Sequence, residues 1–414
     1  MIAYAEALPI VEEEATKRRE LLRSERLPLP ECIGRCSSRD VRSLDNNPRF
    51  DNSAMDGYAV MSAETVGSFA TTPVRLTVKG CLAAGDPPSP DTVQRGGGTC
   101  IEIMTGARFP ERPFDAVVKR EDVEEERGPS GQVTAISLRT PARPGENIRF
   151  AGEDFRIGDC LFLKGTRIGP QHLLALSMAG YVALDVFTRP KVVVLSTGNE
   201  LVPFDSREIS AEQIRNSAAL LLCSALQLYG ADVVFHGLVP DRREEIHQAF
   251  LHALGQKPDL IISTGGVSLG TYDLVRPALE ECGAAIHFHK VAVRPGKPVL
   301  FGDFPSNGPA FFGLPGNPLA VAAAARFFVR PYLTALSGGK REIPHILPLE
   351  QELLKPAGLS FFQRGVRDGQ GVRILPGQAS FMAASFLQAE GWVVGAPEVA
   401  ILKKGDLVEW YPLW

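Results

Sequence analysis

The sequence predicts a multidomain protein in which a parallel α/β sheet domain is combined with smaller β-rich domains. From 188 to 335, apolar runs of strand length alternate with amphipathic helical segments, which is the pattern of a parallel sheet covered on both faces. From 74 to 142, and again after 336, short alternating runs are separated by Gly and Pro, which is typical of small β domains. A chain of 414 residues is long enough for about two to four domains.

The first domain is discontinuous in this interpretation. Residues 4–25 carry a rough apolar stripe among charged residues, and 169–181 read as a short helix. Both flanks of the first β-rich block therefore look helical, so we expect the block to be inserted into a helical domain. The predicted boundaries are 1–50 with 143–187 for the helical domain, 51–142 for the insertion, 188–335 for the α/β domain and 336–414 for a C-terminal small β-barrel.

Composition excludes several function classes. The net charge of −4 gives no basic surface for nucleic acid, and 44% hydrophobic with 22% charged residues is ordinary for a globular protein. No basic segment followed by an apolar core opens the chain, and the most apolar stretch, Leu319–Val329, is short for a membrane span and contains Arg326. Seven scattered cysteines without a C-x-x-C pair favour reduced thiols. We therefore expect a cytoplasmic protein.

Two residue pairs have metal-ligand chemistry but lack partners. Cys32 and Cys36 have no second ligand pair, and His287 and His289 have no third ligand nearby in the sequence. We therefore favour structural roles for both pairs.

The stretch around which the α/β domain is organised is 259–270, DLIISTGGVSLG. Its apolar run predicts a buried strand, and Gly265 and Gly266 then allow backbone N–H groups to approach an anion closely. Asp273 follows just inside the next helix, where it could face a ligand or a metal. A purely structural turn is the alternative.

Two further glycine-containing turns follow strands of the same domain, at 196–200 and at 313–318. In the second, Asn317 suits a helix N-cap and Pro318 the first helical position. Ligands of such sheets bind beyond the carboxyl ends of the strands, so three special turns there favour a binding site. The polar segment 51–60, DNSAMDGYAV, is either an ordered structural loop or a binding loop, and composition does not separate the two.

Taken together, these motifs resemble one family, the molybdopterin molybdenumtransferases, to which the C-terminal domain of gephyrin is also similar. Eight segments carry the resemblance in the family's order: DNSAMDGYAV (51–60), IMTGA (103–107), GENIRFAGED (145–154), LSTGNEL (195–201), STGGVSLGTYD (263–273), RPGKP (294–298), GLPGNP (313–318) and FQRGV (362–366). The family fold has an elongated discontinuous helical domain, an inserted β domain, an α/β domain and a C-terminal β-barrel.

The resemblance implies a reaction and its partners. Adenylylated molybdopterin and molybdate bind, the pyrophosphate link is cut, AMP leaves and molybdenum enters the dithiolene. Mg²⁺ is the implied cofactor, and hard carboxylate oxygens suit it. The family forms homodimers in which each site is shared between subunits, and a molybdopterin adenylyltransferase is an implied partner.

The resemblance also assigns residues. Asp56, Glu200, Asp241 and Asp273 fall on catalytic positions, with Asp241 and Asp273 handling the metal or nucleotide, Glu200 on the pterin side and Asp56 reaching the site from the other subunit. Substrate-binding positions are Thr105, Asp154, Ser263, Gly265, Gly266, Ser268, Arg294, Lys297, Pro315, Arg364 and Ser380, of which Arg364 and Ser380 look like the molybdate-docking pair.

Each key assignment has a structural alternative. Asp273 could be a first-turn helix acid, Asp241 an N-cap, Arg364 a solvated strand residue and Glu200 a surface residue.

The sequence also departs from the family pattern. Arg294 stands where Lys is usual and is a planar fork rather than a point charge. Thr271 stands where a carboxylate is common, Ala379 and Ala384 replace an expected Gly and Ser, and NSAAL (216–220) lacks a second polar residue.

Three other functions remain open beside the transferase. They are a diverged pterin-binding or scaffold homologue, a nucleotidyl-handling enzyme and a tungstate-inserting relative. The extra β domains argue against the second, and the retained Asp56, Asp241, Asp273 and Lys297 argue against the first. Molybdate and tungstate are too alike for the sequence to separate them.

Overall fold

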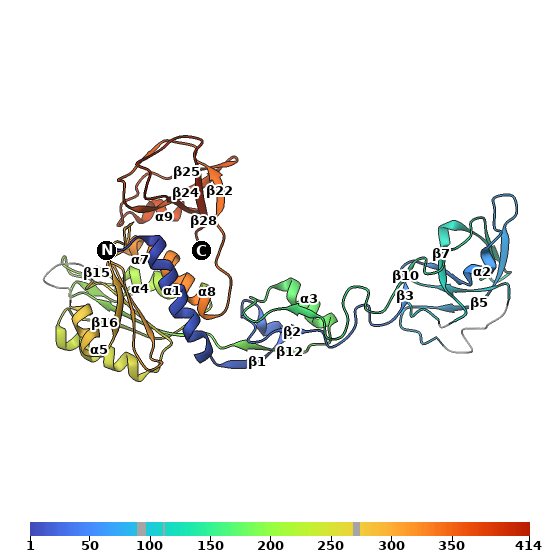
Figure 1. Ribbon diagram of the computed structural model, residues 1–414, viewed down its shortest axis with the longest axis horizontal. Helices are drawn as coiled ribbons and strands as arrows, with labels where there is room; N and C mark the ends of the chain where they lie inside the picture. The colour runs from blue at the N-terminus through green and yellow to red at the C-terminus, as the bar shows by residue number, and fades with distance from the viewer. Residues whose placement is uncertain (89–96, 111, 268–273) are drawn as a thin grey trace. The chain divides into compact units, whose positions relative to one another are not determined.

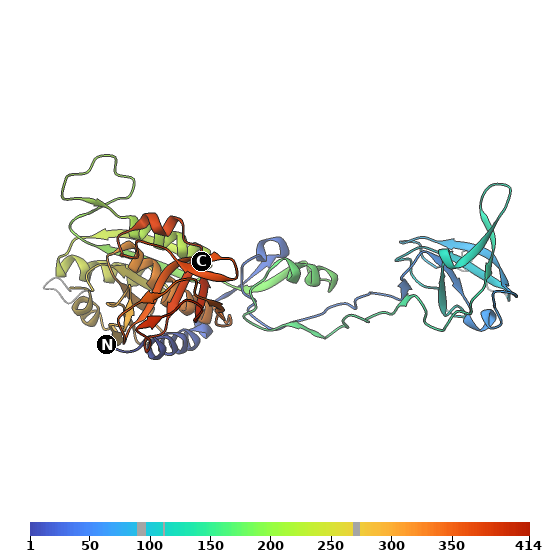
Figure 2. The ribbon, with the colours of Figure 1, turned by 90° about the horizontal axis from the view of Figure 1, so that it is seen from above.

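The computed structural model describes residues 1–88, 97–110, 112–267 and 274–414, with Phe235 and His236 described by their backbone alone. The chain forms two compact units. Unit 1 comprises Met1–Arg39, Lys164–Ile168 and Leu184–Trp414, and unit 2 comprises Asp40–Leu163 and Gly169–Ala183. Figures 1 and 2 show helices and several separate sheets along the chain, so the predicted mixed α/β architecture is confirmed at that level. The four predicted domain boundaries stay a prediction.

Unit 1 contains a six-stranded sheet whose order is β16-β13-β17-β21-β20-β18. The strands are β13 (Lys191–Thr197), β16 (Asp232–Val239), β17 (Leu260–Thr264), β18 (Ala285–His289), β20 (Leu300–Asp303) and β21 (Ala310–Leu314). The first four strands in this order pair in parallel, whereas β20 pairs antiparallel with both of its neighbours, β21 and β18. The prediction of a parallel sheet was wrong at β20, because the short connection from β20 to β21 can join only antiparallel neighbours.

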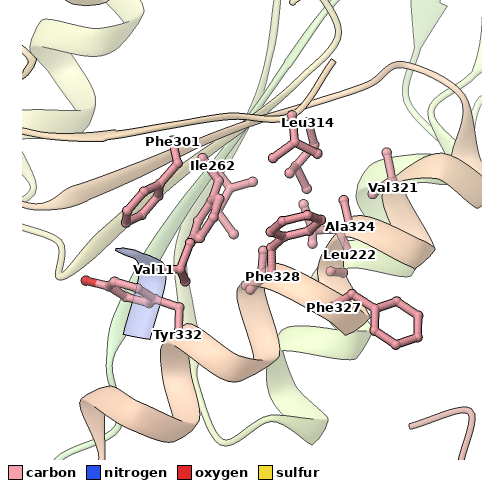
Figure 3. Close-up of a cluster of buried hydrophobic side chains, with 14 of the residues drawn as sticks. Val11, Leu222, Ile262, Phe301, Leu314, Val321, Ala324, Phe327, Phe328 and Tyr332 are labelled. Carbon is pink, nitrogen blue, oxygen red and sulfur yellow. The ribbon is translucent and has the colours of Figure 1, made fainter. Parts of the chain in front are cut away.

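Helices cover both faces of this sheet, as alternation along β13 requires. Val192 and Val194 belong to one apolar cluster with residues of α1 (Tyr4–Arg18), α4 (Ser217–Leu228) and α7 (Pro318–Ala324). Val193 and Leu195 face a second cluster with α5 (Arg243–Gly255) and α6 (Val275–Glu281). Figure 3 shows the first cluster, in which Phe328 and Tyr332 pack toward Ile262 and Phe301 of the sheet. Each fully buried side chain of this size contributes about 1.5–3 kcal/mol.

The central helix of the first layer is continuous from Pro318 to Leu336 and consists of α7, the π-helical turn η4 (Ala325–Val329) and α8 (Arg330–Leu336). It is longer than the apolar stretch seen in the sequence, and by length and hydropathy alone it could cross a membrane. However, 78% of its apolar window is buried within the protein, so it is a core helix. Asn317 and Pro318 occupy the predicted N-cap and first-turn positions.

The N-terminal helix is shorter than predicted. α1 ends at Arg18 and is followed by the 3₁₀ turn η1 (Arg19–Leu21), β1 (Ser24–Pro28) and the turn η2 (Leu29–Cys32). Strand β1 pairs with β12 (Ala183–Phe187). This distant pairing overrides the helical periodicity of residues 19–25, and local patterns do not report such pairing.

After Leu336 the chain forms a second six-stranded sheet. It contains β22 (His345–Pro348), β24 (Ser360–Asp368), β25 (Gly371–Ile374), β26 (Gly391–Gly395) and β28 (Leu407–Pro412), joined at one edge by β19 (Val293–Arg294). The short strands β23 (Leu353–Leu354) and β27 (Ile401–Leu402) pair beside it. Residues 383–387, which the sequence placed among strands and turns, form the helix α9 (Ala383–Leu387).

Unit 2 contains a third sheet, with order β7-β4-β6-β5-β9-β8. Its strands are β4 (Gly57–Val60), β5 (Val74–Leu82), β6 (Thr99–Ile103), β7 (Ala116–Lys119), β8 (Val123–Arg127) and β9 (Val133–Leu138), with the helix α2 (Ser62–Thr65) and the turn η3 (Arg120–Asp122). Strand β3 (Asn52–Ser53) pairs with β10 (Ile148–Arg149), β2 (Val41–Arg42) pairs with β11 (Cys160–Phe162), and the predicted short helix is α3 (Pro170–Met178). The segment 51–60 is therefore ordered.

Candidate functional site

The carboxyl ends of three parallel strands place the first group of predicted residues at one edge of the sheet in unit 1. Strand β13 ends at Thr197, β16 at Val239 and β17 at Thr264, and all three are hydrogen-bonded neighbours. Gly265 donates its N–H to the Leu314 carbonyl at 3.0 Å, and Gly198 donates to Val239 at 3.2 Å. These bonds tie the turns of neighbouring strands together at the edge where ligands of α/β sheets bind.

Glycine is required in the turn after β17. Gly265 and Gly266 have φ angles of +87° and +63°, in the left-handed region. A Cβ atom at Gly265 would lie 2.4 Å from the Thr197 carbonyl oxygen, and one at Gly266 would lie 2.7 Å from a methyl of Val275. The two glycines therefore let β13 and β17 approach each other closely at the candidate site.

Asp241 lies at the same edge, beyond the end of β16. Its backbone N–H donates to Asn199 Oδ1 at 3.1 Å, which joins it to the turn after β13. Burial raises the pKa of the Asp241 carboxyl, and the neighbouring Glu200 raises it further. The N-cap of α5 is Arg242, so the alternative in which Asp241 caps this helix was wrong.

The other predicted residues of this edge differ in accessibility. Glu200 is exposed, so its alternative as a surface residue stays open. Ser263 is fully buried inside β17, and its hydroxyl has no hydrogen-bond partner among the described residues. Ser268 and Asp273, together with the departure at Thr271, lie outside the described residues.

The second group lines a pocket of about 720 Å³ in unit 1, between the segments after β18 and β21 and the C-terminal sheet. Four predicted residues belong to its wall: Arg294, Lys297, Pro315 and Ser380. Its other lining residues come mainly from segments 354–363 and 378–381. Strand β19 explains this arrangement, because Val293 and Arg294 pair with Ser360 and Phe361 of β24.

The pocket is positively charged. The ionisable side chains in its described wall are the two cations Arg294 and Lys297, and both are exposed to solvent. The guanidinium of Arg294 lies 5.7 Å from the centroid of Phe361, close enough for a cation–π contact. Cations without lining carboxylates favour an anionic ligand.

Arg364 lies behind the pocket wall and is only 1% exposed, so its interpretation as a solvated strand residue was wrong. Its guanidinium donates to the Gly377 carbonyl at 2.7 Å and to Ala379 at 3.4 Å. Its Nε is buried without a hydrogen-bond partner in the described chain, and burial lowers the pKa of the side chain. Arg364 therefore holds the segment that carries Ser380 and keeps one N–H available.

A third group lies in unit 2. The Asp56 carboxylate accepts hydrogen bonds from both the backbone N–H and the hydroxyl of Thr105, each at 2.7 Å. These two bonds lower the pKa of Asp56, so the exposed carboxylate stays ionised. Asp154 is also exposed and accepts a bond from Asn47 Nδ2 at 2.8 Å. Asp56 and Thr105 thus act as one pair.

The histidine pair has structural partners, as expected. His287 Nε2 lies 2.8 Å from Asp303 Oδ1, and His289 Nε2 lies 3.1 Å from the Val267 carbonyl oxygen. In the described chain, Glu14, His287 and Asp303 form the one cluster with metal-ligand spacing. The guanidinium of Arg18 contacts both carboxylates of this cluster, and its positive charge opposes a metal ion there. All seven cysteines are free thiols.

Sequence reasoning missed several residues of these sites. Asn199 positions Asp241, and Gln378 donates to the carbonyls of Arg364 and Leu375 at 2.9 and 2.8 Å. Phe361 and Gln363 line the pocket beside them. Asn199 and Gln363 lie inside the quoted motifs and could have been found there, whereas Phe361 and Gln378 lie outside them and have no local signal.

Comparison with known proteins identifies the family. Residues 2–180 match the family described as "MoeA N-terminal region (domain I and II)", and residues 193–335 match the family described as "Probable molybdopterin binding domain". A molybdopterin molybdenumtransferase of Synechococcus elongatus is 35% identical over 410 residues, which is 99% of either chain. The chain belongs to the molybdopterin molybdenumtransferase family.

Other members agree with this assignment. The molybdopterin molybdenumtransferase of Haemophilus influenzae is 34% identical over 393 residues, which is 93% of each chain. The crystal structure of a molybdopterin biosynthesis MoeA protein from Pyrococcus horikoshii superimposes with a TM-score of 0.77 at 30% identity, covering 97% of this chain and 98% of that one. The predictions of a molybdopterin molybdenumtransferase family member and of a transferase are therefore confirmed.

Proposed function

We propose that this chain inserts molybdenum from molybdate into adenylylated molybdopterin and releases AMP, the last step of molybdenum cofactor synthesis. The observation that carries the proposal is the cationic pocket beside the glycine-containing strand ends in unit 1. Pro315 belongs to the pocket wall and follows β21, whose neighbour β17 ends at Thr264, directly before Gly265. A bound metal oxyanion and a bound nucleotide would thus lie near the same edge of the sheet.

The strand ends suit the phosphates of the substrate. The backbone of Gly265 and Gly266 has no side chain to hold an anion away, and Asp241 and Glu200 lie at the same edge. Ser268 is assigned to the same phosphate turn by its motif position. Glu200 is assigned to the pterin side, since it is exposed and free to contact a ligand.

Mg²⁺ fits the carboxylates at this edge. Burial and the charge of Glu200 both raise the pKa of Asp241, and a cation between substrate and protein would offset these effects, which supports the proposal. Asp241 and Asp273 are the proposed ligands. When bound, Mg²⁺ would neutralise charge on the pyrophosphate oxygens, while Asn199 holds the Asp241 backbone in place.

Molybdate is the proposed ligand of the pocket. Arg294 and Lys297 provide positive charge in the wall, Ser380 provides a hydroxyl, and the free Nε–H of Arg364 provides a donor behind the wall. Ala379 contributes its carbonyl to Arg364, and an Ala supplies that carbonyl as well as the expected Gly would. Tungstate has the same shape and charge and is the alternative oxyanion.

The remaining parts of the proposal concern assembly. Asp56, Thr105 and Asp154 would reach the site of a second copy of the chain, so the active form is a homodimer with shared sites. A molybdopterin adenylyltransferase would deliver the substrate, and a cytoplasmic location suits seven free thiols. The four domains with the predicted boundaries form part of the same proposal.

The test is an assay with purified protein, adenylylated molybdopterin, Mg²⁺ and molybdate, following AMP release. We expect molybdate-dependent AMP release that falls by about two orders of magnitude or more in Asp241→Asn. Asp232→Asn is the matched control, because Asp232 is 59% exposed at the opposite end of the same strand. Substrate binding without turnover in the unmodified chain would refute the transferase and point to the scaffold alternative.

A further inference from the structure

Lys355 is a buried lysine next to the cationic pocket. It is only 5% exposed, although Leu354 and Pro356 on either side line the pocket. Lysine is rarely buried without a partner of opposite charge. The hydrogen bond that its ammonium makes in the described chain goes to the Leu359 carbonyl at 3.3 Å, and it forms no ion pair with a described carboxylate.

Packing fixes this side chain beside one aromatic ring of the pocket wall. The Lys355 ammonium lies 5.5 Å from the centroid of Phe361, the same ring that Arg294 contacts at 5.7 Å. A Cβ atom at Gly395 would lie 3.2 Å from Lys355 Cδ, so the aliphatic stem packs closely against β26. Phe361, which lines the pocket, therefore has a second cation beside it that is not itself part of the lining.

Burial of this unpaired charge is unfavourable in the free protein. Burial lowers the pKa of Lys355, and the charge of Glu398 partly opposes this effect. Glu398 is the charged group of the described chain that acts on Lys355, and Arg294 contacts the same Phe361 ring. An anion bound in the pocket would offset the unfavourable burial of the Lys355 charge.

We propose that Lys355 determines the charge specificity of the pocket, by favouring a tetrahedral dianion over a tetrahedral monoanion of similar size. This inference rests on the proposed function of the pocket as an oxyanion site. Lys355 lies outside the pocket lining and acts through space, whereas Arg294, Lys297 and Ser380 lie in the wall itself. It is thus a specificity-determining residue rather than a catalytic one.

Loss of the Lys355 charge should weaken the binding of the two anions unequally. Coulomb energy is proportional to the charge of the ligand, so the fold-loss for a dianion should be the square of the fold-loss for a monoanion. Removal of the Lys355 charge should weaken molybdate binding about tenfold and perrhenate binding about threefold. Arginine keeps the charge and should keep the ratio of the two affinities.

The experiment is titration calorimetry on the full chain with molybdate and with perrhenate at pH 7. The variants are Lys355→Met, Lys355→Arg and, as a control, Lys404→Met, since Lys404 is 72% exposed in the same domain. We expect the unequal losses in Lys355→Met, near-normal affinities in Lys355→Arg and no change in Lys404→Met. Equal losses for both anions in Lys355→Met would show a packing role and overturn the proposal.

A second measurement avoids dependence on folding of the methionine variant. In the unmodified chain, molybdate affinity should fall more steeply than perrhenate affinity as pH rises and Lys355 loses its proton. Lys355→Arg should reduce this difference, because arginine stays protonated. An unchanged difference in Lys355→Arg overturns the role of Lys355. Failure of either anion to bind the unmodified chain overturns the proposed pocket as well.

Discussion

Replacement of Gly265 by alanine should perturb the sheet edge in two separable ways. The first is conformational: φ at Gly265 is +87°, and an L-residue in this region costs about 1–2 kcal/mol. The second is steric: the new Cβ would lie 2.4 Å from the Thr197 carbonyl oxygen, which is backbone and cannot rotate away. Relief of the contact requires β13 and β17 to separate, and we expect about 2 kcal/mol or more beyond the conformational cost.

Gly283 provides the matched control. Its φ of +86° is almost the same, but a Cβ atom there would have nothing within 4 Å. Gly283→Ala should therefore show the conformational cost alone, about 1–2 kcal/mol.

Hydrogen exchange measured by mass spectrometry suits this comparison, because it reports local opening in a chain of several domains. Peptides from β13 and β17 should exchange faster in Gly265→Ala than in Gly283→Ala, and AMP release should be lost in the first variant only. If both variants exchanged alike and released AMP alike, the close approach at Gly265 would have no role in the site.

Three further variants test the described contacts. Asp241→Asn should melt no lower than the unmodified chain at pH 7, because the raised pKa of Asp241 means that folding disfavours its ionised carboxylate. This destabilisation is present above the folded-state pKa and is relieved as the pH falls through it, so melting temperatures of both proteins at pH 7 and pH 4 check the direction of the effect. Thr105→Val should return the pKa of Asp56 toward its ordinary value, measured by NMR titration, since both bonds that lower it come from Thr105 and one comes from the hydroxyl. Arg326→Met should lower the free energy of unfolding by about 2–4 kcal/mol and speed hydrogen exchange in β28. The Arg326 side chain is 2% exposed and donates to the Pro412 carbonyl at 3.1 Å and to Glu342 at 2.7 Å. Unchanged protection of β28 would contradict a role of Arg326 in holding this strand.

The sequence predicted those parts of the fold whose cause is local. The apolar run before Gly265, the Asn317-Pro318 helix start and the helix at 170–178 each depend on a few neighbouring residues. The pairings of β1 with β12 and of β19 with β24 instead depend on partners far along the chain. Periodicity within a window contains no information about such partners.

The same distinction applies to the candidate site. Motifs identified Arg294, Lys297, Pro315 and Ser380, and the structure brings all four to one pocket. Burial explains why Arg364 was hard to interpret, because its environment is set by the 377–379 carbonyls rather than by its own strand. No motif in the sequence marks Lys355, and the fold alone buries it.

Strand β19 makes the C-terminal sheet depend on the α/β domain. Val293 and Arg294 lie between β18 and β20 in the chain, yet they complete the edge of the later sheet beside Ser360 and Phe361. The Ser360 N–H bonds the Ala292 carbonyl at 2.9 Å, and Ala292 in turn donates to Ile2 at 2.8 Å. A chain cut after Leu336 would lose the wall of the pocket and the pairing partner of Arg294 together. The C-terminal sheet is therefore not a detachable module, and grafting it onto another protein would require carrying residues 291–298 with it.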